Sequence, residues 1–365
     1  GEPKNPMLLL LPFALAYGQT VRNPASVHSG RTILRQAQSA RGFVPFSRPS
    51  PVRMPWSQKA LDILGVRRNV LMRAGAGRRE IDTSEVTVVT GGGTGIGQAA
   101  ALRLAKRGMS VLVVGRREAA LQETKQLAEE QGLKGKIIPV VADVTEEKGR
   151  QAVVDAVEKL AKGGATLRGL VHNAAVNTPC KRMMEIPQDE WLKVTDINVN
   201  GPLFLTQKLY PLFGKDNPER NRVMMISSVA RTCTGLPAYG PYCVSKLTFY
   251  GLHLMFKEEM TEGKNPVYSA SLIPGEVDTE MQRATAYGQD DGVFPENLVK
   301  YWREIQESGQ LLPPEVTGAF MEYVLCDTTP EEFQKEEWFI YDTKHHKDWA
   351  HEFPDVKIVE PQGLF

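Results

Sequence analysis

Residues Val86–Gly97 read VTVVTGGGTGIG. The β-branched run Val86–Thr90 predicts a buried strand, and the apolar spacing in Gly95–Arg107 predicts a helix directly after it. Glycine permits a tight turn between the two and lets the backbone approach a pyrophosphate, while the helix start offers unpaired N–H groups to it. We therefore expect a dinucleotide-binding turn made of Gly91, Gly93, Thr94, Gly95, Ile96 and Gly97.

The rest of the chain alternates short apolar runs with helical patterns. Further strands are expected at 110–114, 137–141, 170–172, 223–227, 268–273 and 338–341. Strands that alternate with helices in this way form a parallel sheet, and right-handed crossovers place helices on both of its faces. The sequence thus predicts an α/β fold: one domain with a doubly wound parallel sheet of about seven strands and a ligand crevice at their carboxyl ends.

Charge and composition divide the chain near residue 80. Residues 1–79 hold 13 Lys or Arg and two Asp or Glu, whereas the remainder holds 31 and 41. The apolar run Met7–Ala16 followed by an Arg- and Ser-rich, acid-poor stretch indicates a signal plus transit peptide over residues 1–80, of the kind that directs proteins to plastids. The secretory pathway, the cytoplasm and an untargeted extension remain alternatives. The mildly acidic remainder argues against nucleic-acid binding.

Residues 81–345 form the expected catalytic domain. One segment inside this domain interrupts the alternation of strands and helices, and a second segment follows the domain. A stretch of about residues 276–314 carries aromatic residues among polar ones and lies just past a strand end, which favours a substrate-covering insertion. Residues 346–365 are polar with scattered aromatics, and we expect a solvated tail. No segment after residue 80 is long and apolar enough to cross a membrane. The four cysteines show no zinc-ligand spacing, so we expect no metal.

The cofactor is expected to be NADP(H) rather than NAD(H). The second strand ends in Gly115-Arg116-Arg117, where a carboxylate would be needed to bind the 2′-hydroxyl of NAD. An arginine can instead form a forked pair with a 2′-phosphate. Arg116 is the better placed of the two, and Arg117 could also be a surface residue at a helix start.

A second constellation lies about 135 residues beyond the turn. Tyr242 and Lys246 are four residues apart on one helix face, and Ser228 precedes Tyr242 by fourteen residues. A free tyrosine has a pKa of about 10, and a nearby lysine cation favours its phenolate. This group suits proton transfer to or from a carbonyl oxygen, with Ser228 holding that oxygen in line.

With these motifs in this order, residues 85–345 resemble the short-chain dehydrogenase/reductase family in its single-domain Rossmann-fold form. The resemblance rests also on Asp143-Val144, Asn173-Ala174-Ala175 (glycine is usual at the last position), INVNG around Asn198, and Pro274-Gly275. It implies that Asn198 joins Ser228, Tyr242 and Lys246 in catalysis through a water-linked proton relay. It implies cofactor binding by the glycine turn, Arg116, Arg117, Tyr242 and Lys246, and by Asp143, Val144, Asn173, Ala174, Pro274, Gly275, Val277 and Thr279. It also implies a homo-oligomer, dimer or tetramer, formed through the helices near 189–210 and 239–260.

We therefore expect an oxidoreductase that transfers hydride between NADPH and a small-molecule carbonyl or alcohol. The absence of a Lys/Arg cluster in 276–314 favours an uncharged, partly apolar carbonyl. The alternative is an NADP-binding structural or redox-sensing subunit with little catalysis, because a fold alone does not fix a function.

Overall fold

A seven-stranded, fully parallel sheet forms the centre of the computed structural model, which describes residues 81–233, 236–287, 293–335 and 337–361. Its strand order is β3-β2-β1-β4-β5-β6-β7. The strands are β1 (Glu85–Thr90), β2 (Ser110–Gly115), β3 (Lys136–Val141), β4 (Thr166–His172), β5 (Arg222–Ile226), β6 (Tyr268–Ile273) and β7 (Trp338–Phe339). The order reverses between β1 and β4, and this switch point is where such sheets open a crevice. The predicted fold class is confirmed.

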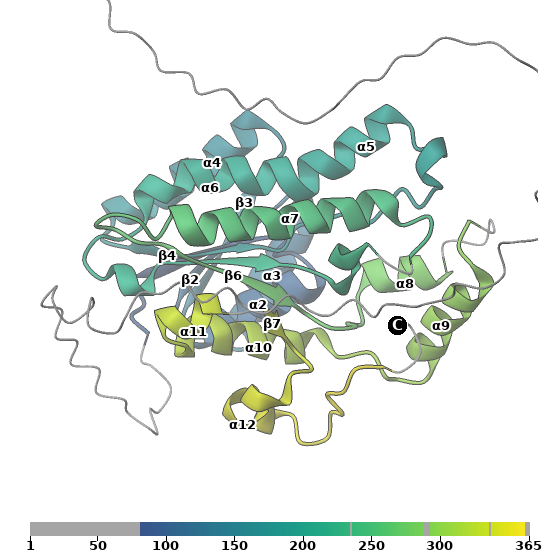
Figure 1. Ribbon diagram of the computed structural model, residues 1–365. Helices are drawn as coiled ribbons and strands as arrows, with labels where there is room; N and C mark the ends of the chain where they lie inside the picture. The colour runs from purple at the N-terminus through teal and green to yellow at the C-terminus, as the bar shows by residue number, and fades with distance from the viewer. Residues whose placement is uncertain (1–80, 234–235, 288–292, 336, 362–365) are drawn as a thin grey trace, which may run out of the picture. The chain divides into compact units, whose positions relative to one another are not determined.

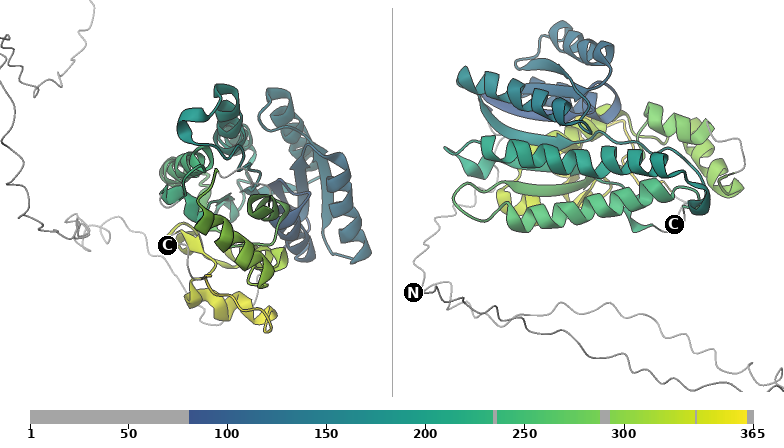
Figure 2. Two further views of the ribbon diagram at one scale, coloured as in Figure 1. Left: turned by 90° about the vertical axis from the view of Figure 1, so that its right-hand side faces the viewer. Right: turned by 90° about the horizontal axis from the view of Figure 1, so that it is seen from above.

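Two groups of helices cover opposite faces of the sheet (Figures 1 and 2). One group is α2 (Gly95–Lys106), α3 (Glu118–Glu130) and α10 (Pro314–Asp327); the other is α4 (Glu147–Lys162), α6 (Gly201–Leu209) and α7 (Gly240–Glu259). Successive side chains of a strand point to opposite faces. Accordingly Val111 and Val113 join the first group and Leu112 and Val114 the second, all fully buried. Strand β2 is therefore apolar on both sides over Val111–Val114, because both of its faces are covered.

The helix predicted over 189–210 is one continuous helical stretch with a local change of pitch. It runs through α5 (Gln188–Thr195), a π-helical turn (Asp196–Asn200) and α6. Asn198 sits inside the π-helical turn and is 2% exposed. Such turns widen a helix locally and are frequent at functional sites.

The predicted insertion is a helical cap at one end of the sheet (Figures 1 and 2). It consists of α8 (Glu280–Tyr287) and α9 (Glu296–Glu307). Phe294, Leu298 and Trp302 are buried in a third apolar cluster with Tyr239, which lies at the start of α7. The cap is thus tied to the helix that carries Tyr242.

The expectation of a solvated tail is wrong. After α11 (Pro330–Lys335) and β7 the chain forms α12 (His346–Trp349) and packs on α10. Trp349 is 2% exposed and lies 5.0 Å from the Phe320 ring, centroid to centroid. Glu352 accepts two hydrogen bonds from Arg103, of 2.9 and 3.0 Å. The C-terminal segment forms only short helical turns, and these give no periodic apolar pattern in the sequence. For this reason the sequence predicted a solvated segment.

Two sequence expectations concern other parts of the chain. The leader assigned to residues 1–80 lies outside the described residues, so its targeting role stays a prediction. Within the described ranges, none of the helices has the length and apolar character needed to cross a membrane.

Candidate active site

The glycine turn after β1 is held against the loop after β4 by Asn173. Its side-chain nitrogen donates to the carbonyl oxygens of Thr90 (3.1 Å) and Gly91 (3.3 Å). The Thr90 hydroxyl in turn accepts from the backbone N–H groups of Asn173 and Ala174. The predicted turn and the predicted Asn173 are therefore one unit at the switch point of the sheet.

Two glycines of this turn leave no room for a Cβ atom. Gly91 has φ +66°, and a Cβ there would lie 2.8 Å from the Asn173 side-chain nitrogen. A Cβ on Gly97 would overlap the carbonyl oxygen of Gly91. Gly95, at φ +54°, brings the turn against the Thr279 side chain. The backbone can therefore be approached closely at the start of α2, which is what a bound pyrophosphate requires.

A cavity of about 230 Å³ opens on one side of the turn. We call it the turn cavity. Among the predicted residues, those lining it are Gly91, Gly93, Thr94, Arg116, Arg117, Asp143, Val144 and Ala174.

Both arginines of the turn cavity are more than half exposed and loosely paired. An Arg116 nitrogen lies 3.8 Å from an Asp143 oxygen, and an Arg117 nitrogen lies 3.7 Å from an oxygen of Glu280 in α8. Arg117 also donates to the Thr94 hydroxyl at 3.4 Å. Asp143 accepts two hydrogen bonds from Thr145 (3.0 and 2.7 Å), which orient its carboxylate. The residues present therefore fit the adenosine half of a dinucleotide.

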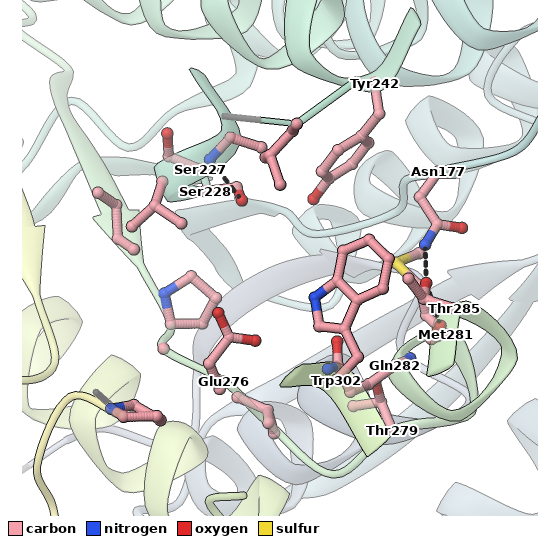
Figure 3. Close-up of a pocket in the computed structure, with 18 of the residues that line it drawn as sticks. Asn177, Ser227, Ser228, Tyr242, Glu276, Thr279, Met281, Gln282, Thr285 and Trp302 are labelled. Atoms are coloured by element: carbon pink, nitrogen blue, oxygen red, sulfur yellow. Dashed lines mark hydrogen bonds between the residues drawn. The ribbon is translucent and has the colours of Figure 1, made fainter. Parts of the chain in front are cut away.

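A second cavity of about 430 Å³ lies on the other side of the turn and beneath the helical cap (Figure 3). We call it the tyrosine cavity. The predicted residues that line it are Ile96, Ser228, Tyr242, Pro274, Gly275, Val277 and Thr279. The two cavities flank one turn, so a dinucleotide laid across the turn would place its two ends in them.

Tyr242 faces the tyrosine cavity and Lys246 lies behind it. The lysine nitrogen donates to the carbonyl oxygen of Ile226 at 2.7 Å and stands 5.6 Å from the centre of the Tyr242 ring. Burial lowers the pKa of Lys246 to about 8. Burial also raises the pKa of Tyr242 to about 12, against which the hydrogen bond from Ser228 acts in the opposite direction.

The direction of the Tyr242 shift differs from the sequence expectation. The sequence indicated a lysine that lowers the pKa of the phenol, whereas in the folded chain burial disfavours the charged form of each group and raises the pKa of Tyr242. Tyr242 is therefore held as a protonated phenol, which is the form that donates a proton to a substrate oxygen.

Ser228 and Asn198 complete the predicted set in different ways. Ser228 caps a short helical turn, its hydroxyl accepting from the N–H of Ala230 at 3.2 Å. Asn198 lines neither cavity. Its side chain accepts from the N–H of Val176 and donates to the carbonyl of the same residue, both at 2.8 Å, and donates to Ser245 at 2.9 Å. Asn198 thus fixes the loop after β4 to the helix of Tyr242.

Three groups at the tyrosine cavity were missed in the sequence. Asn177 donates to Tyr239 (2.7 Å) and to Thr285 of α8 (2.8 Å), which ties the cap to the central loop. Trp302 of α9 covers the cavity, and the Glu276 carboxyl points into it (Figure 3). Glu276 follows the Pro274-Gly275 motif directly, so its position in the sequence already indicated a residue beside the cofactor site.

Comparison with known proteins agrees with this geometry. Residues 85–290 match the family model for short chain dehydrogenase. The chain is 31% identical over 209 residues to dehydrogenase/reductase SDR family member 4 of Bos taurus, covering 57% of this chain and 71% of that protein. The human protein of the same name gives 31% over 210 residues, with 58% and 72% covered.

Solved structures share the fold. A short-chain dehydrogenase/reductase from Saccharomyces cerevisiae aligns with a TM-score of 0.61 and 26% identity, covering 73% of this chain and 99% of that one. L-sorbose reductase from Gluconobacter frateurii aligns with a TM-score of 0.57 and 21% identity, covering 70% and 94%. The family model matches more than half of the chain, and this decides the assignment: this chain is a member of the short-chain dehydrogenase family of oxidoreductases.

Proposed function

We propose that the protein transfers hydride between NADPH and a small-molecule carbonyl or alcohol, with Tyr242 as the general acid and base. The observation that carries the proposal is the placement of Tyr242 and Ser228 on one wall of a cavity that begins at the glycine turn. Lys246 behind the tyrosine and Asn198 behind the loop hold that wall in place. A cavity with convergent polar groups and shifted pKa values is the usual form of an active site.

The turn cavity supports a preference for NADP(H) over NAD(H). Two arginines line it at the end of β2, where binding of a 2′-hydroxyl would call for a carboxylate. Arg116 and Arg117 are paired only loosely with carboxylates, at 3.8 and 3.7 Å, so either can turn toward a phosphate. When bound, the nicotinamide supplies the hydride, and Pro274, Gly275 and Thr279 line the space for its ring.

Side chains of this protein supply the proton to the substrate oxygen and stabilise the charge that is left behind. In reduction, Tyr242 donates its phenolic proton to the substrate oxygen, and the Ser228 hydroxyl donates a hydrogen bond to the same oxygen. The resulting phenolate is stabilised by the Lys246 cation on its far side, at a distance where a buried charge acts strongly. Lys246 is 4% exposed, so its charge acts in a medium of low dielectric constant.

Tyr242→Phe tests the proposal. The variant removes one hydroxyl and keeps the ring, so NADPH binding should persist while NADPH oxidation against a panel of aldehydes and ketones falls by about 100-fold or more. Tyr250→Phe is the matched control, because it lies on the same helix and does not line the cavity. Full turnover by Tyr242→Phe would refute the role of the phenol. NADPH binding by the wild-type chain with no turnover of any carbonyl would favour the structural or redox-sensing subunit.

We also propose that the protein forms a homo-oligomer through the outer face of α5, α6 and α7. Five large apolar side chains there are 40–52% exposed: Leu192, Phe204, Leu247, Leu254 and Met255. An apolar face of this kind on neighbouring helices suits burial against a second copy of the same chain.

A further inference from the structure

The charged side chains that line the tyrosine cavity are all acidic. Among its lining residues that the structure describes, none is Lys, Arg or His, whereas Glu276 and Glu360 both line it. The two glutamates come from different parts of the chain, one after β6 and the other from the C-terminal segment. A ligand in this cavity therefore meets negative charge and no positive side chain.

Glu276 is directed into the cavity by the backbone. Gly275 has φ +81°, and a Cβ there would lie 2.7 Å from Ile340 and 2.8 Å from the Tyr341 hydroxyl. The backbone N–H of Glu276 then donates to that hydroxyl at 2.9 Å. Figure 3 shows the carboxyl pointing toward the space between Tyr242 and Trp302. The orientation is therefore set by a turn that requires glycine and by a backbone hydrogen bond, and no described residue forms a hydrogen bond or ion pair with the carboxylate itself.

The described part of the chain supplies no cation to Glu276 or Glu360. Burial and, to a smaller extent, the charge of Glu360 together raise the pKa of Glu276 to about 7. A carboxylate that has lost water and gained no counter-charge costs free energy, which a cationic ligand would recover.

Aromatic rings surround the same space. Tyr301 and Trp302 of α9 and Tyr341 after β7 line the cavity, and we call these three the aromatic wall. Trp302 is fixed by an edge contact with Phe294, with ring centres 4.9 Å apart. Faces of Trp and Tyr attract organic cations, and aromatic rings together with a carboxylate form the common recognition site for ammonium groups.

We propose that the substrate of this site carries an ammonium group, which Glu276 holds against the aromatic wall while Tyr242 faces the carbonyl or alcohol. This inference rests on the function proposed above and narrows its substrate class from any small-molecule carbonyl or alcohol to an amino- or ammonio-carbonyl or the corresponding alcohol. It replaces the uncharged carbonyl that the sequence favoured. A metal ion is a poor occupant, because no group of three His, Cys, Asp or Glu side chains in the described ranges could hold one. Anionic substrates are disfavoured by the two glutamates.

The charges facing Glu276 predict how cation binding depends on pH. From the packed elements these are Glu360 of the C-terminal segment, Tyr301 of α9, Tyr341 after β7 and Tyr242 of α7. Burial raises the pKa of each of the three tyrosines, so they stay neutral near pH 7. Affinity for a cation should therefore fall as the pH drops through about 7 and Glu276 takes up a proton.

Choline and 3,3-dimethylbutan-1-ol form a suitable probe pair, because they have the same shape and differ only in the charged nitrogen. Each is titrated calorimetrically into the full chain, with and without saturating NADPH. We expect the wild type to bind choline about tenfold or more tightly than the neutral isostere. Glu276→Gln should remove about tenfold of that preference or more, and Glu360→Gln less, because Glu360 is exposed.

Glu296→Gln is the matched control, since it removes the same charge from the exposed start of α9 without lining the cavity. It should leave the preference for choline unchanged. Equal binding of the two probes by the wild type, or an unchanged preference in Glu276→Gln, would overturn the inference. A third outcome would also overturn it: a Glu276→Gln variant that binds NADP⁺ more weakly and binds NADPH and choline as the wild type does. Glu276 would then serve the oxidised nicotinamide. Because no probe needs to react, these outcomes are separate from the hydride-transfer test with Tyr242→Phe.

Discussion

Replacing Lys246 with Met tests the most consequential electrostatic feature of the site. The side chain is 4% exposed, and burial lowers its pKa from 10.5 to about 8. Below about pH 8 both the native and the unfolded chain hold the lysine proton, and the native state bears the full cost of the buried cation. Between about pH 8 and 10.5 the unfolded chain holds more of this proton, so the free energy of unfolding should rise with pH over that window.

The size of the effect follows from the shift. The lowered pKa corresponds to about 3 kcal/mol, at about 1.4 kcal/mol for each unit. Lys246→Met removes this titration together with the hydrogen bond to Ile226, whose loss costs the same at every pH. The difference in unfolding free energy between wild type and variant should therefore shift in favour of the wild type by about 2–3 kcal/mol from about pH 7 to about pH 10.

Urea unfolding followed by circular dichroism at pH steps over this range measures the difference. Subtracting the unfolding free energies of the two proteins cancels the titration of every group that they share. Repeating the comparison in a Tyr242→Phe background removes the titration of the phenol as well. A difference that stays constant with pH would mean that the native lysine titrates as in the unfolded chain. The reasoning about its burial would then be wrong.

Two further predictions concern packing and assembly. Trp349→Ala should lower the free energy of unfolding by about 3–5 kcal/mol, because the ring is buried against Phe320. Urea denaturation measures this change, and a loss under about 1 kcal/mol would mean that the C-terminal segment is solvated after all. Leu247→Glu should shift the mass measured by light scattering toward the monomer, because the side chain is 49% exposed on the face proposed to meet a second copy; an unchanged mass would place the interface elsewhere.

The parts of the site that the sequence predicts well are those set by local rules. The glycine turn follows from sterics within a few residues, and the pairing of Tyr242 with Lys246 follows from helix periodicity. The directions of the pKa shifts of Tyr242 and Lys246 do not follow from local rules, because they depend on how deeply the folded chain buries both groups. The sequence placed Asn198 in a helix, as the structure does. Its hydrogen bond with the backbone of Val176 depends on a π-helical turn, which no residue pattern predicts.

Long-range packing explains the two larger differences. Trp349 is buried because α10 presents Phe320 to it, and the sequence around Trp349 shows no periodicity that would reveal this partner. Glu276 was visible beside the Pro274-Gly275 motif, but its direction depends on Tyr341, which lies 65 residues further on. Glu360 comes from the segment that was expected to be solvated.

The walls of the tyrosine cavity come from two parts of the chain that differ in their match to the family model. Ser228, Tyr242 and Lys246 lie within residues 85–290, the stretch that matches the family model. The aromatic wall and Glu360 all lie beyond residue 290. Changes beyond residue 290 would therefore reshape this side of the cavity and leave Ser228, Tyr242 and Lys246 in place, while Glu276 is the residue of the proposed cation site that lies inside the matched stretch.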